Sequence, residues 1–98
     1  MLSYTEIQSA YVELYIQLRK YIWDFKTVEK IADLEVAVYR TFPDVEDLSK
    51  KLSDLNLDIR STCAEDADLN SAVDNFFDVL DTEASLYAKL NQVREVIQ

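Results

Sequence analysis

The chain has 98 residues, a formal net charge of −9 and a hydrophobic content of 49%, and it contains no glycine and no histidine. This length matches one domain, and the hydrophobic content is sufficient for a folded core. The absence of glycine disfavours β-rich folds and phosphate-binding loops, because their tight turns need positive φ angles. We therefore predict one all-α domain, 1–98, with long amphipathic helices packed as an antiparallel helical hairpin or a three- to four-helix bundle with coiled-coil-like contacts.

Negative charge is concentrated in the second half of the chain. Residues 1–43 carry six acids and five bases, whereas residues 44–98 carry thirteen acids and five bases. Between residues 61 and 88 there are seven acids and no base. Because binding to nucleic-acid phosphates or to anionic membranes needs cationic groups, we expect neither as a direct partner.

The sequence also indicates where the protein resides. No basic segment followed by an apolar run is present near residue 1, and no apolar stretch reaches the ~20 residues of a membrane-spanning helix. Cys63 is the single cysteine, so an intrachain disulfide is excluded. We expect a cytoplasmic protein.

The first 43 residues predict one long helix. Ser3, Tyr4, Thr5 and Glu6 have the spacing of a capping box, and Pro43 ends the helical pattern. Between them runs a heptad series in which only Glu35 is polar, which is typical of a helix that packs along its whole length. Its members are Ile7, Tyr11, Leu14, Leu18, Tyr21, Phe25, Val28, Ala32, Glu35, Tyr39 and Phe42.

Two further helices are predicted after Pro43. Asp44 is a good N-cap, and a second heptad series begins at Val45. The series weakens at Thr62 and Asp66, which predicts a turn near 62–68 with Asp66, Asp68 or Asn70 as the next cap. It then resumes in phase: Leu69, Val73, Phe76, Leu80, Glu83, Tyr87, Leu90, Arg94 and Ile97.

Three architectures are compatible with these patterns. The one that we favour has helices near 4–42, 44–62 and 69–97, because the heptad phase of the first series is continuous. The second is a two-helix hairpin bent at Pro43. The third divides the first helix near 24–27 and forms a compact four-helix bundle.

The first helix has a second apolar face. At about 100° per residue, Val12, Ile16 and Trp23 lie roughly opposite the heptad stripe, and Tyr15 lies beside them. Eight of the eleven aromatic residues fall within residues 1–42, and tyrosine and tryptophan are common at interfaces. These residues fill the core if the bundle has four helices. Otherwise they bind a protein partner, either a second copy of the chain or a larger protein, and we favour this hypothesis.

The sequence contains few of the residue types that usually carry out catalysis. Without histidine and with one cysteine, zinc sites of the Cys/His type and Ser-His or Cys-His pairs are excluded. Residues 66–74 begin like a calcium-binding loop, but Ser71 replaces the turn glycine and Phe77 the bidentate glutamate. We therefore predict a non-catalytic interaction or assembly protein with no metal and no cofactor.

An alternative function uses the acidic half of the chain. Asp74, Asp78, Asp81 and Glu83 lie in the segment without bases, and a helical surface of this charge can imitate nucleic-acid phosphates. Such a protein would inhibit a DNA- or RNA-binding partner. The simpler interpretation is that these acids keep an apolar helical protein in solution.

Overall fold

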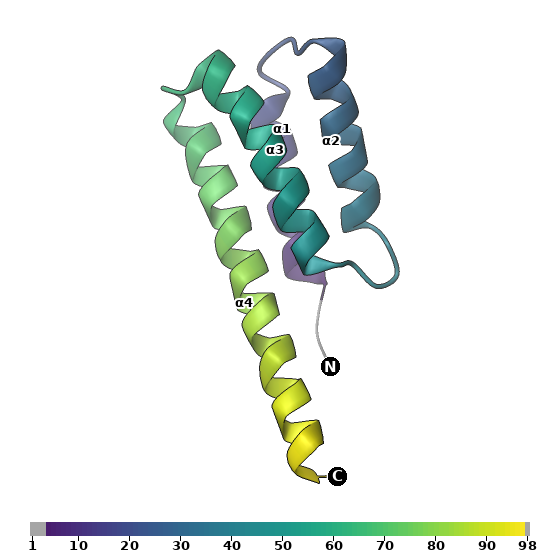
Figure 1. Ribbon diagram of the computed structural model, residues 1–98. Coiled ribbons are helices and arrows are strands. Elements are labelled where there is room, and N and C mark those ends of the chain that lie inside the picture. The colour runs from purple at the N-terminus through teal and green to yellow at the C-terminus, as the bar shows by residue number, and fades with distance from the viewer. Residues whose placement is uncertain (1–3, 98) are drawn as a thin grey trace.

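Four helices make up the fold. The computed structural model describes residues 4–97, with side chains described for residues 4–86, 88 and 89. The helices are α1 (Thr5–Leu18), α2 (Phe25–Val38), α3 (Val45–Cys63) and α4 (Ala67–Ile97), and consecutive helices run in opposite directions (Figure 1). The all-α prediction is confirmed, and the third of the three architectures is the one observed. Within the described chain, no helix is long and apolar enough to cross a membrane.

The predicted continuous helix 4–42 is wrong, because the chain turns between α1 and α2. Lys20 and Tyr21 donate backbone hydrogen bonds to the carbonyls of Gln17 and Leu18, which tightens and closes the last turn of α1. Asp24 then begins a new helix, since its Oδ1 accepts a hydrogen bond from the Thr27 backbone N–H at 2.8 Å.

The predicted boundaries of the two later helices, 44–62 and 69–97, agree with α3 and α4 within two residues, whereas the predicted end at 42 lies four residues beyond the end of α2. Asp44 caps α3 by accepting hydrogen bonds from the backbone N–H groups of Glu46 and Asp47. Asp66 caps α4 by accepting one from the N–H of Leu69 at 3.0 Å. The predicted capping box falls partly on Ser3, which lies outside the described residues; α1 itself begins at Thr5.

One core joins all four helices. α1 packs mainly on α4, and α2 packs mainly on α3. α3 also packs on α4, whereas α1 contacts α2 over a short stretch only. The α1 positions of the heptad series are buried as predicted, and so are those of α3 from Leu48 to Ile59 and those of α4 as far as Glu83. Val45 is partly buried and Thr62 is exposed. The largest fully buried side chains are Tyr11, Phe76, Ile7, Leu14, Leu18, Leu34, Leu48, Leu52, Leu55, Ile59, Leu69 and Leu80.

In α2 the buried side of the helix is not the predicted one. The heptad series places Val28, Ala32, Glu35 and Tyr39 in the core, yet all four are exposed. The side chains that face the core are those one residue earlier: Thr27, Ile31, Leu34 and Val38. One residue corresponds to a rotation of about 100° around the helix axis, so the apolar stripe of the series is turned out of the core.

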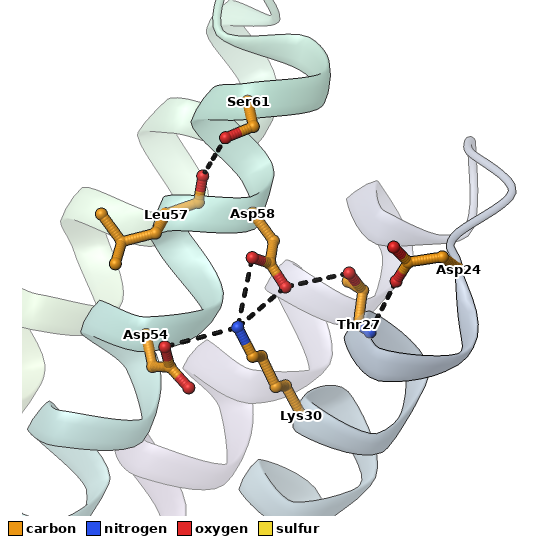
Figure 2. A network of polar contacts seen from close by, with 7 residues as sticks. All are labelled: Asp24, Thr27, Lys30, Asp54, Leu57, Asp58 and Ser61. Carbon is orange, nitrogen blue, oxygen red and sulfur yellow. Dashed lines mark hydrogen bonds and ion pairs between the residues drawn. The ribbon is translucent and has the colours of Figure 1, made fainter.

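Polar contacts between α2 and α3 stabilise the observed orientation of α2 about its own axis. Thr27 Oγ1 donates a hydrogen bond to Asp58 at 2.9 Å, and Lys30 Nζ lies 3.0 Å from Asp58 and 3.3 Å from Asp54 (Figure 2). The Asp58 and Asp54 carboxylates raise the pKa of Lys30. Because Thr27 and Lys30 must face α3 to make these contacts, Val28 and Tyr39 are directed away from it.

Candidate interaction surface

Two stripes of exposed apolar side chains lie on neighbouring helices. The α1 stripe comprises Val12, Tyr15 and Ile16, with exposed fractions of 45%, 42% and 55%. The α2 stripe comprises Phe25, Val28, Val36 and Tyr39, and their exposed fractions range from 48% to 75%. Together the two stripes are called the α1–α2 face below.

The two stripes meet at a group of three tyrosines. The ring of Tyr11 stacks on that of Tyr15 with 6.1 Å between centroids, and Tyr39 meets Tyr11 edge to face at the same distance. Tyr11 is buried, whereas the other two are half exposed. These rings fill the seam between α1 and α2, where few other contacts join the helices.

Tyr11 has a buried hydroxyl without a hydrogen-bond partner among the described residues. Burial raises the pKa of this hydroxyl well above its ordinary value, and Glu35, Tyr15 and Tyr39 raise it further. The group is therefore neutral at physiological pH, and the seam contributes aromatic surface without charge.

Three of the four predicted partner-binding residues lie on this surface. Val12, Tyr15 and Ile16 are exposed, as an interface residue of the isolated chain must be. Ile16 also borders a shallow groove of about 380 Å³ between α1 and α4, opposite Asp68, Ser71 and Ala72.

Trp23 is not part of the α1–α2 face, contrary to the prediction. The prediction assumed that Trp23 continued the helix of Val12 and Ile16, but this residue lies in the loop after α1. Its Nε1–H donates a hydrogen bond to the Leu18 carbonyl at 2.8 Å, and its ring packs against the core and edge to face on Tyr21. Trp23 thus satisfies a carbonyl at the end of α1.

The α2 stripe was missed by the sequence analysis, although its signal was present. Phe25, Val28 and Tyr39 belong to the heptad series that was assigned to the core of a long helix. Periodicity shows that one side of a helix is apolar, but not whether that side faces the core or solvent.

Three of the four residues of the predicted acidic surface are exposed. Asp74, Asp78 and Asp81 are exposed, and none of them forms an ion pair with another described residue. Glu83 is not on that surface, because only 4% of it is exposed. It occupies a core position of the α4 heptad series, which is why it is buried.

Asp66 makes structural contacts, and Cys63 is a thiol of low reactivity. Asp66, the first residue of the loop that resembled a calcium site, binds Lys20 Nζ at 2.8 Å and accepts a hydrogen bond from Tyr21. Burial and the Asp66 carboxylate raise the pKa of the Cys63 thiol, so its reactive thiolate form is disfavoured. Among the side chains of residues 4–86, 88 and 89, no group of three or more carboxylate or cysteine side chains is placed to hold a metal ion.

Comparison of the chain with protein-family models, with curated proteins and with solved structures finds no match. Its function is therefore argued from the surface itself.

Proposed function

We propose that the protein is a non-catalytic helical assembly protein that associates with a second copy of itself through the α1–α2 face. The observation that carries this proposal is the number of exposed large apolar side chains on two adjacent helices. Of eleven such residues in the described chain, seven lie on α1, on α2 or at the C-cap of α2. Ile22 and Phe42 lie in the loops that flank α2, and Leu57 on α3 and Leu86 on α4 are isolated among the described residues. An exposed apolar surface of this kind is typical of a protein interface.

The distribution of charge favours a second copy as the occupant. The segment that contains α1 and α2 is nearly neutral, with six acids and five bases in residues 1–43. Two copies that meet through this segment bring little net charge together. Their acidic halves, which carry thirteen acids and five bases each, remain apart in solvent.

The composition of the face is also that of an interface. Tyrosine and phenylalanine bury a large area with few rotatable bonds, and Tyr15 and Tyr39 keep a hydroxyl for polar contacts. The tyrosine group at the seam places both of these rings on a buried third ring, which limits the entropy that they lose on binding.

The proposal is tested by placing one charge on each stripe. We expect Ile16→Asp and Val36→Asp to convert the dimer to a monomer in sedimentation velocity experiments, with unchanged helical circular dichroism. Leu57→Asp is the matched control, because Leu57 is 65% exposed but lies on α3, away from the face. A dimer that persists in both face variants, or that is lost equally in the Leu57 variant, contradicts the proposal.

A second candidate function rests on the free carboxylates of α4. Asp74, Asp78 and Asp81 follow one another at intervals of four and three residues, so they form one exposed acidic row on the helix. We propose that this row binds a basic, nucleic-acid-binding protein if the α1–α2 face does not dimerise. A complex that weakens with added salt and with the triple change to lysine supports this function; a salt-independent complex contradicts it.

A further inference from the structure

A pocket of about 820 Å³ opens beside Tyr4 and the α2–α3 loop. This loop and the beginning of α1 lie at the same end of the bundle (Figure 1). Three segments that are distant in sequence meet there: the residue before α1, the α2–α3 loop with the first turns of α3, and the middle of α4. Its lining residues are Tyr4, Phe42, Pro43, Asp44, Val45, Glu46, Ser49, Asp81, Glu83 and Ala84. The volume is in the range of sites for small organic ligands.

Glu83 is the unusual member of this lining. It is 96% buried, since 4% of it is exposed, and its Oε2 has no hydrogen-bond partner among the described residues. A buried carboxylate oxygen without a partner is costly, so a protein normally supplies a cation or a donor for it. Burial raises the pKa of Glu83, and the neighbouring Glu6 carboxylate raises it further, while no described residue acts in the opposite direction.

The other described residues of the pocket do not supply a cation for Glu83. The described lining contains four carboxylates and no lysine or arginine. Asp44 is already used to cap α3, and Glu46 pairs with Lys50 at 3.6 Å, which leaves Asp81 and Glu83 without a partner among the described residues. An anionic ligand would be repelled by these groups.

The walls of the pocket favour a ligand with an apolar body. Tyr4, Phe42, Pro43, Val45 and Ala84 contribute rings and aliphatic groups to the lining. A hydrated metal ion gains nothing from such walls, and it needs several converging oxygen ligands. An organic ammonium group gains a counter-ion from Glu83 and contact with the faces of the two aromatic rings.

We infer that this pocket binds a small organic cation, with an ammonium or guanidinium group opposite Glu83 and an apolar body against Tyr4, Phe42 and Val45. The site is independent of the α1–α2 face. The ligand supplies a positive charge that no described residue places next to Glu83.

The experiment uses benzylammonium as the probe and benzyl alcohol as its neutral counterpart. Binding to the full chain is followed by chemical-shift changes of backbone amides at constant ionic strength. We expect saturable binding of benzylammonium that shifts the amides of Ser49 and Ala84, and binding of benzyl alcohol roughly tenfold weaker, as expected for loss of one charged contact. Equal binding of the two probes, or no saturation, overturns the inference.

Three variants localise the effect. Glu83→Gln keeps the shape of the side chain and should weaken benzylammonium binding about tenfold. Asp78→Asn removes the same charge from the same helix outside the pocket and should leave binding unchanged. Phe42→Ala removes an aromatic wall that is 81% exposed, so it tests the site without altering the core, and it should also weaken binding. Equal weakening by Asp78→Asn and Glu83→Gln, or unchanged binding in Phe42→Ala, contradicts the site.

Discussion

The hydroxyl of Tyr21, in the loop after α1, donates a 2.5 Å hydrogen bond to Oδ2 of Asp66, which is 45 residues further along the chain. The same carboxylate binds Lys20 Nζ at 2.8 Å, and its other oxygen caps α4. One side chain therefore joins the end of α1 to the beginning of α4. The hydrogen bond raises the pKa of Tyr21 to about 12, and Lys20 and Tyr21 hold the pKa of Asp66 well below its usual range.

Tyr21→Phe removes this link without changing the ring. We expect the melting temperature at pH 7 to fall by a few degrees, because the hydrogen bond to a charged acceptor is lost while packing is kept. The folded-state pKa of Asp66 is lowered, so its stabilising contribution is present above the ordinary aspartate pKa of 3.8 and is lost as the pH falls below it. The two proteins differ in the folded-state pKa of Asp66, so the difference in melting temperature between wild type and variant should stay constant through the ordinary aspartate pKa and narrow only as the pH falls through the lowered folded-state pKa. An equal effect of Tyr21→Phe in a protein that already carries Asp66→Ala would show that the Asp66 carboxylate is not responsible.

The rotation of α2 is tested by comparing Leu34→Ala with Val28→Ala. Leu34 is fully buried, so its truncation should lower the free energy of unfolding by roughly 2–4 kcal/mol. Val28 is 48% exposed, and its truncation should cost less than about 0.5 kcal/mol. Both changes in the free energy of unfolding are to be measured by urea unfolding at low protein concentration, where association contributes least. The reverse order would mean that the heptad stripe of α2 faces the core after all.

The heptad pattern was sufficient to predict much of this fold from the sequence. In α3 and α4 the apolar series, the caps at Asp44 and Asp66, and the weak positions Thr62 and Asp66 gave the helices and the turn between them. It failed between α1 and α2 because the apolar series stays in phase through the loop at residues 19–24 and along α2. Nothing in a heptad series marks a loop whose own residues, such as Tyr21, are also apolar.

The candidate surface could be predicted only in part for the same reason. Val12, Tyr15 and Ile16 follow from the helical period alone, and they are exposed. The orientation of the α2 stripe depends instead on Thr27 and Lys30 meeting Asp58, a contact between residues about thirty positions apart in the chain. Glu83 was a member of the heptad series and also of the acidic segment, and its heptad position decided its burial.

Trp23 is expected to affect stability and not association. Replacing it by phenylalanine removes the hydrogen bond to the Leu18 carbonyl and part of the packing against Tyr21, which should cost about 1–3 kcal/mol of unfolding free energy. The mass in solution should remain that of the wild type. The adjacent Ile22, which is fully exposed, provides the control: Ile22→Ser should change neither quantity. If Trp23→Phe lost association and kept its stability, Trp23 would be an interface residue, which contradicts this account.

Glu83→Gln should stabilise the free protein at pH 7. The folded-state pKa of Glu83 is raised, so the wild-type side chain favours folding below its unfolded pKa of 4.5, and this contribution is lost as the pH rises through the folded value. The variant should therefore melt a few degrees higher than wild type at pH 7 and at about the same temperature at pH 4. The acidic groups nearby are Glu6 on α1, Asp81 on α4, and Asp44 and Glu46 at the start of α3. A variant that is less stable than wild type at pH 7 contradicts a buried carboxylate without a partner.

The mass of the wild-type chain in solution tests the central claim most directly. It is measured by size-exclusion chromatography with light scattering over a range of protein concentrations, in low and in high salt. Dimerisation through the apolar α1–α2 face predicts a species of twice the 11.4 kDa chain mass that becomes more populated with concentration and persists in high salt. A mass of 11.4 kDa under all of these conditions would contradict it.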